Sequence, residues 1–222
     1  VEDKTGSVTI HFQNPEEFVE IDEDDVVGLI IENSNGIFIC QKIVWPDIPV
    51  KKEFTHTSSN LTCIFAPNVD SEKLSKWIKE NKTEQNIVFT NTIDLERLLE
   101  DMKNNIKILN YPVNTILQID KVAIMFLNKN FLDKISAGTS TIQKILQILK
   151  KRFVGGKVNY MNKTILDDFF VDTIPDVICI DGAENSEETN YKNTTILLLS
   201  QNEKEIYSAN LKTRETIKVN LT

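Results

Sequence analysis

Few side chains in this sequence have the types and spacing that suit catalysis or metal binding. The two histidines, His11 and His56, stand apart from other metal-ligating residues, which argues against a zinc site and against histidine acid–base chemistry. The paired acids Asp167 and Asp168, together with Asp181, would suit a metal-dependent nuclease if their carboxylates converged on a divalent ion. Neither a companion acid nor a supporting histidine is evident. We therefore expect no catalytic residue, no metal and no cofactor.

A basic segment is the strongest candidate for a binding surface. Residues 128–163 carry eight basic side chains and one acid, Asp133, within a protein of net charge −8. Flexible cations bind nucleic-acid phosphates with strong salt dependence and little sequence preference. Lys144 and Lys150 instead fit the solvated outer face of an amphipathic helix. The expected phosphate-binding residues are Lys129, Lys134 and Lys163, with Lys151, Arg152 and Lys157 as further candidates.

The overall charge favours a different partner. An acidic protein repels nucleic acid on average, so DNA binding would depend on the local basic segment. Residues 164–190 carry eight acids and no base, which suits a basic protein partner. Charge therefore leaves both a DNA-binding protein and a protein-binding scaffold open.

The cysteines and the hydropathy indicate an intracellular protein without a membrane segment. Cys40, Cys63 and Cys179 each lie in an apolar run, and their odd number argues against a disulfide framework. We expect three reduced, buried thiols. No apolar run approaches the ~20 residues that a membrane-spanning helix needs.

Strands alternate with helices along most of the chain, and this order predicts the fold class. Apolar runs predict strands, capping residues and helical spacing predict helices, and the residues from 194 to 221 read as antiparallel strands. We expect an acidic arm over residues 1–25 and one core domain over 26–222. The core is expected to be an α/β fold with a mainly parallel sheet flanked by helices. The expected strands include 26–32, 61–66, 87–90, 115–127 and 157–161, and the expected helices are 71–80, 94–108 and 139–153.

This order of elements resembles the ATPase core of the RecA family of recombinases. The family's phosphate loop has the form GxxxxGK[ST], and the matching stretch here keeps Gly36 but has Ile37 and Phe38 at the lysine and hydroxyl positions. The family's catalytic carboxylate has no counterpart in residues 63–68. An apolar strand ending in Asp120 resembles the one whose aspartate organises the family's metal site, so Asp120 would be a relic.

The resemblance implies a RecA-like paralogue that has lost ATPase activity and is not an enzyme. Short paralogues of this kind, such as the recombinase-like pair in the Shu complex, imply a heterodimer that binds single-stranded or forked DNA. Such a protein would promote assembly of the recombinase filament during homologous recombination, a DNA repair process, in the nucleus. The alternative is an ATPase-dead RecA-like scaffold subunit, similar to those of Elongator, without direct DNA contact.

Overall fold

The computed structural model describes residues 1–3, 5–13, 21, 25–81, 83–135, 140–152, 171–201 and 204–221. The chain divides into two compact units. The smaller comprises Val1–Pro49 and Ile135–Asp172, and the larger comprises Val50–Lys134 and Thr173–Thr222. The domain boundary that the sequence indicates after residue 25 stays a prediction.

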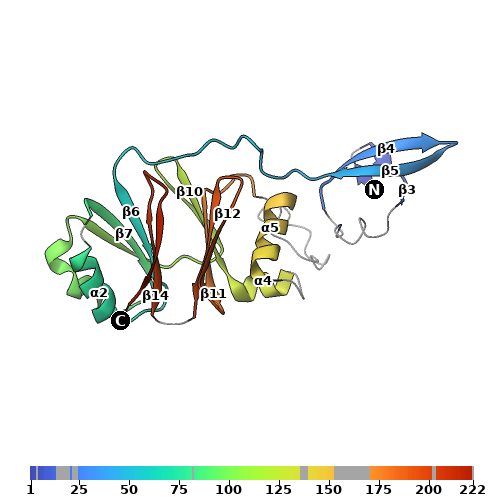
Figure 1. Ribbon diagram of the computed structural model, residues 1–222. Coiled ribbons are helices and arrows are strands. Elements are labelled where there is room, and N and C mark those ends of the chain that lie inside the picture. Colours follow the sequence, from blue (N-terminus) through green and yellow to red (C-terminus); the bar gives the residue numbers. More distant parts are fainter. Residues whose placement is uncertain are drawn as a thin grey trace. The chain divides into compact units, whose positions relative to one another are not determined.

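The first sheet of the larger unit has five strands in the order β15-β14-β6-β7-β8. Figure 1 labels three of them, β14, β6 and β7. Its three parallel strands are β6 (Leu61–Phe65), β7 (Gln85–Thr90) and β8 (Ile106–Asn110). The antiparallel strands β14 (Glu205–Asn210) and β15 (Thr216–Asn220) extend the sheet beyond β6. Strand β8 therefore lies at one edge.

The second sheet has five strands in the order β12-β13-β11-β10-β9. Its parallel strands are β10 (Val122–Asn128), β11 (Val177–Ala183) and β13 (Thr194–Ser200). Two antiparallel strands, β9 (Thr115–Ile119) and β12 (Glu187–Tyr191), form the edges. Helix α4 (Lys129–Ile135) begins directly after β10.

Apolar side chains from both sheets form one buried core between them. Alternate residues of a strand point to the same face, so Leu61, Cys63 and Phe65 all contribute to this layer. Phe126 of β10 lies 6.0 Å from Phe65 and 4.9 Å from Phe89 between ring centroids. The burial of these rings holds the two sheets face to face.

Two helices cover the outer face of the first sheet. Helix α2 (Ser71–Glu80) begins at Asp70, whose side chain accepts a hydrogen bond from the Lys73 N–H at 2.9 Å. Helix α3 (Leu95–Leu98) is followed by the 3₁₀ turn η1 (Glu100–Met102). Their apolar residues pack with β6, β7 and β8 in a second buried cluster that includes Leu74, Ile78, Leu95 and Leu99.

The smaller unit contains a three-stranded sheet and one longer helix. Strands β3 (Ile10–Phe12), β5 (Ile37–Val44) and β4 (Gly28–Ser34) pair in that order, and β1 (Glu2–Asp3) pairs with β2 (Gly6–Ser7). Helix α5 (Thr141–Lys151) begins with a reciprocal capping box between Ser140 and Gln143. Among the described residues, no helix has the length and apolar character needed to cross a membrane.

The prediction of one mainly parallel RecA-like sheet is wrong. Ten strands of the larger unit instead form two mixed sheets of five. Residues 115–127 form two antiparallel strands with a turn at Asp120, and residues 94–108 form a short helix, a 3₁₀ turn and the start of β8. Apolar periodicity identified many strands but could not determine which sheet each strand joins. The expected strand at 157–161 lies outside the described residues.

Asp176 joins elements of both sheets through a buried ionic network. Its carboxylate accepts hydrogen bonds from the Ala123 N–H of β10 at 2.9 Å and from Lys52 Nζ at 2.6 Å. Arg214, from the turn between β14 and β15, lies with Nη1 3.7 Å from Asp176 Oδ1 and donates through Nη2 to the Asp176 carbonyl. The Thr195 N–H of the second sheet also donates to that carbonyl, at 2.9 Å.

We predict that Asp176→Ala destabilises the protein severely. The substitution leaves the buried Lys52 and Arg214 cations without their carboxylate, and breaking a buried ion pair in this way typically costs about 3–5 kcal/mol. Urea unfolding of the whole chain measures the loss. The control is Asp101→Ala, which removes an exposed pair with Lys79 (3.5 Å) and should change stability by about 1 kcal/mol or less. Equal losses in the two variants would contradict the role assigned to Asp176.

Candidate functional site

Three of the six expected DNA-binding residues have described side chains, and each has a partner within the protein. Lys129, the first residue of α4, forms an ion pair with Asp133 at 2.9 Å, and the hydrogen bond to that carboxylate raises its pKa. Lys151 pairs with Asp25 at 2.7 Å and lies over the Trp45 ring, 5.4 Å from its centroid.

Arg152 ends α5 in the left-handed conformation, with φ of 55°. Its Nε and Nη2 donate to the carbonyls of Val171 and Asp172, both at 2.8 Å. The side chain of Lys134 and the whole of Lys157 and Lys163 lie outside the described residues, as do Asp167 and Asp168.

The residues matched to a phosphate loop lie in a β-hairpin. Gly36, with φ of 86°, closes the turn between β4 and β5, and its N–H donates to the Asn33 side chain at 2.9 Å. Ile37 and Phe38 then begin an antiparallel strand. A phosphate loop leads from a strand into a helix, so this local geometry differs from that of the family.

Asp120, matched to the metal-organising aspartate, lies in the tight turn between β9 and β10. Its φ is 54°, and its Oδ2 accepts hydrogen bonds from the Ser58 N–H (2.8 Å) and Ser58 Oγ (3.1 Å). These hydrogen bonds lower the Asp120 pKa. In the structure Asp120 therefore connects a turn to the segment that precedes β6.

The carboxyl ends of the parallel strands meet at one edge of the sandwich. Phe65 ends β6 and Phe89 lies one residue from the end of β7, and both rings contact Phe126 near the end of β10. Tyr111, which follows β8, packs edge-on against the same Phe126 at 5.3 Å. In open α/β sheets this edge is where ligands commonly bind.

Tyr111 has a buried hydroxyl without a partner at this edge. The residue is 5% exposed, and no hydrogen-bond partner of Tyr111 Oη exists among the described residues. Burial raises the Tyr111 pKa well above its ordinary value, and the charges of Cys179 and Asp181 raise it further.

Asp181 presents a second unpartnered oxygen at the end of β11. It pairs in register with Asn128, and a bulge follows between Asp181 and Ala183, where Gly182 has φ of 87°. The buried Asp181 Oδ1 has no partner in the described part of the chain. Burial raises the Asp181 pKa, although a hydrogen bond from the Gly182 N–H opposes this effect.

Lys129 and two asparagines complete the edge. A side chain at Gly182 would contact the Lys129 Cβ at 3.6 Å, so the base of Lys129 lies beside the bulge. The Asn128 N–H donates to Asn114 Oδ1 at 3.3 Å, which brings the segment after Tyr111 to the end of β10. We define the carboxyl-edge site as Tyr111, Asn114, Asn128, Lys129, Asp181 and Gly182.

Sequence reasoning found only part of the carboxyl-edge site. It selected Lys129 for DNA and considered Asp181 only for a nuclease. Tyr111 was missed, because it follows the segment 94–108 that was expected to be a helix and not a strand. The sequence signal that could have indicated Asp181 is its position near the end of an apolar strand, directly before a glycine.

Comparisons with known proteins give distant structural likenesses only. No protein-family model matches, and no curated protein is similar enough to show a family. A Thermotoga maritima protein solved by NMR is 13% identical, covering 72% of this chain and 98% of its own, with a TM-score of 0.38. A conserved Streptococcus pneumoniae protein, a predicted phosphoesterase, is 8% identical, with coverages of 74% and 99% and a TM-score of 0.35. Vps29 of Entamoeba histolytica, in complex with Zn²⁺, is 9% identical, with coverages of 74% and 100% and a TM-score of 0.33.

The recombinase predictions are therefore wrong. Of the structures described above, one is a predicted phosphoesterase and one is Vps29, and none of the three supports a recombinase paralogue, a Shu-like complex, DNA binding or a RecA-like scaffold. The prediction that the chain is not an enzyme followed from the same resemblance and is wrong with it. At these identities and TM-scores, the likenesses carry no argument about what this chain binds or does.

Several predictions remain untested. The absence of a resident metal or cofactor, a partner subunit and the nuclear location stay predictions. In the described residues, no group of three or more His, Cys, Asp or Glu side chains is arranged to hold a metal ion.

We predict that removing the charge of Asp181 and removing that of Asp120 change the melting temperature at neutral pH in opposite directions. The raised Asp181 pKa means that the folded state binds its proton more tightly than the unfolded state, so its contribution to stability falls as pH rises past the ordinary aspartate range. Asp181→Asn should therefore raise the melting temperature at neutral pH by a few degrees, with a smaller gain in acid.

Asp120→Asn is the matched control, because the Asp120 pKa is lowered. Its charged form contributes stability above the ordinary aspartate pKa, and that contribution is lost as pH falls. The variant should therefore melt at a lower temperature than the wild type at neutral pH. Thermal unfolding across a pH series checks both variants. Melting temperatures that change in the same direction at neutral pH would contradict the different environments assigned to Asp181 and Asp120.

Proposed function

We propose that the larger unit is a ligand-binding domain whose carboxyl-edge site takes a small molecule with a primary ammonium or guanidinium group. The observation that carries the proposal is the pair of buried oxygens, Tyr111 Oη and Asp181 Oδ1, which have no partner among the described residues. An unsatisfied buried polar group costs about 1–3 kcal/mol, so a ligand that donates to both oxygens recovers this energy on binding.

The electrostatics of the two oxygens favour a cation that also donates hydrogen bonds. Burial partly desolvates Asp181 and raises its pKa, and the Asp181 charge adds to the effect of burial in raising the Tyr111 pKa. A cationic N–H group would stabilise the Asp181 carboxylate, and a second N–H could donate a hydrogen bond to the Tyr111 hydroxyl oxygen. Binding would lower the Asp181 pKa and release a proton over the range in which this carboxyl titrates.

The raised Asp181 pKa also favours proton transfer to a bound ligand as a second candidate function. General acids and bases are tuned by burial toward the operating pH, and Asp181 is shifted in that direction. Hydrolysis of chromogenic carboxylate and phosphate esters, measured for the wild type and for Asp181→Asn, tests this candidate. Turnover that persists in Asp181→Asn would exclude Asp181 as the acid or base.

We predict that agmatine and ethanolamine bind the wild type and that choline binds more weakly. All three are cations, but the quaternary ammonium of choline has no N–H to donate to Tyr111 or Asp181. Isothermal calorimetry on the full chain measures the difference. A charge-assisted hydrogen bond contributes about 1.5–3 kcal/mol, so choline should bind about tenfold or more weakly.

Matched variants locate the binding in the protein. Asp181→Asn should weaken agmatine binding at least as much as replacing agmatine by choline, Tyr111→Phe should weaken it by a smaller factor, and Asp120→Asn should leave it unchanged. The proposal would be wrong if no amine bound, or if the affinity for agmatine stayed the same in both Asp181→Asn and Tyr111→Phe.

A further inference from the structure

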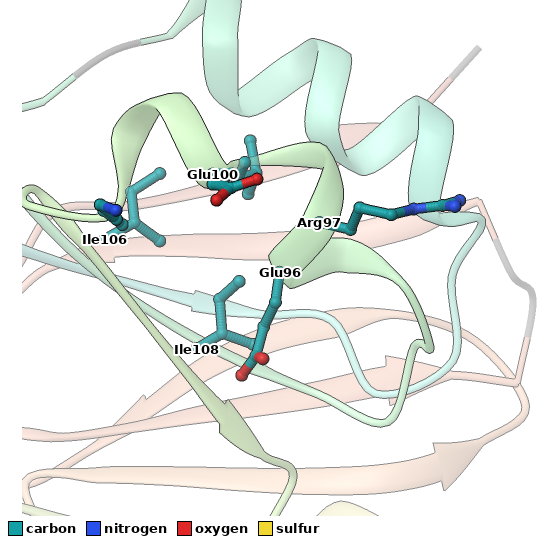
Figure 2. Close-up of a pocket in the computed structure, with 7 residues that line it drawn as sticks. Glu96, Arg97, Glu100, Ile106 and Ile108 are labelled. Atoms are coloured by element: carbon teal, nitrogen blue, oxygen red, sulfur yellow. The ribbon is translucent and has the colours of Figure 1, made fainter.

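A separate pocket of about 420 Å³ lies between the α3–η1 segment and strand β8 (Figure 2). Its residues come from a single stretch of the larger unit and are distinct from the carboxyl-edge site. The lining residues are Glu96, Arg97, Leu99, Glu100, Lys103, Ile106 and Ile108.

The pocket has an apolar floor and charged walls. Ile106 and Ile108 are alternate residues of β8, so both side chains lie on the face that α3 covers, and Leu99 is 2% exposed. Glu96 and Glu100 are four residues apart, and neither side-chain carboxylate has an ion-pair or hydrogen-bond partner among the residues that the structure describes. In Figure 2 the Arg97 side chain extends away from both glutamates and both isoleucines.

Strand β8 also has an open edge beside this pocket. The sheet order ends at β8, so no described strand pairs with its outer side. The Asn105 carbonyl accepts from the Asn86 N–H at 2.8 Å, and the Tyr111 N–H donates to the Thr90 carbonyl at 3.1 Å, so odd-numbered residues face β7. Because backbone direction alternates along a parallel strand, the backbone groups of Ile106 and Ile108 point to the open edge.

The same two residues therefore offer both parts of a peptide site. Their N–H and C=O groups can pair with an added strand, and their side chains form the floor of the adjoining pocket. An added strand brings its own side chains over that floor at every second position. Two cations, Arg97 and Lys103, share this lining with the two glutamates. A long aliphatic stem with a cationic end suits the isoleucine floor and the side of the pocket that carries the two carboxylates.

We propose that this site binds an extended basic segment of a partner protein, which adds as a strand along β8 and inserts a lysine or arginine side chain into the pocket. The methylenes of that side chain contact Ile106, Ile108 and Leu99, and its charged end lies between Glu96 and Glu100. The net charge of −8 supports this partner, because an acidic protein attracts a basic segment during encounter.

The test uses the full-length chain and fluorescent peptides of the pattern Thr-Val-Thr-X-Thr-Val-Thr. The central residue X is lysine, arginine, norleucine or glutamate, and norleucine keeps the lysine stem while removing its charge. Fluorescence anisotropy should show the lysine and arginine peptides binding about tenfold more tightly than the norleucine peptide. N-methylation of the backbone beside X should abolish binding, because it blocks strand addition.

Protein variants distinguish the contribution of the two glutamates from that of the isoleucine floor. Glu96→Gln/Glu100→Gln should remove the preference for lysine over norleucine, whereas the exposed Glu72→Gln on α2 should keep it. Ile108→Ala should weaken both peptides, with circular dichroism showing that each variant is folded.

Three outcomes would overturn the proposal. No binding of any peptide would exclude a strand site on β8. Equal binding of the lysine and norleucine peptides would remove the role of the two glutamates, and preference for the glutamate peptide would point to an acidic partner held by Arg97 and Lys103.

Discussion

The buried carboxylate of Asp176 is the constraint on which the sandwich depends. It is hydrogen-bonded within the second sheet and ion-paired with Lys52 and with Arg214, which comes from the turn that closes the first sheet. Two cations around one 3% exposed carboxylate are stable only if all three groups stay together, because each alone would be a desolvated charge. The network therefore fixes how β11 begins and how the last two strands approach it.

Two aspartates, one just before β11 and one within it, lie in opposite environments. The first has a structural role, and the second is a candidate for ligand binding. Asp176, before the strand, has its carboxylate fully engaged by backbone and cations. Asp181, five positions later, has a buried oxygen without a partner in the described chain and a pKa raised by burial. Since the first already holds the sheets, the second contributes nothing evident to the fold, and a ligand is the natural counterpart for its unpaired oxygen.

The sequence predicted elements better than topology. The cysteines are free and buried as expected, and helices 71–80 and 139–153 match α2 and α5 because their capping residues are local signals. The apolar run at 115–127 forms a hairpin that its sequence pattern does not indicate, because the pattern hardly changes at Asp120, where the turn has positive φ. Tyr111 and Asp181 belong to different sheets, so only the packing of one sheet against the other brings them to the same edge, and no local pattern could indicate this.

Strand β8 and the residue that follows it contribute to both the pocket beside α3 and the carboxyl-edge site. Ile106 and Ile108 line the pocket, and their backbone groups point to the open edge. The chain that follows β8 carries Tyr111 to the carboxyl-edge site. Strand β8 is an edge strand of the first sheet, so the backbone groups on its outer side have no described strand partner. A strand added along this edge would complete its hydrogen bonding and thereby hold Tyr111 more firmly against Phe126. The position of the unpartnered phenol is thus set by the pairing of the strand that precedes it.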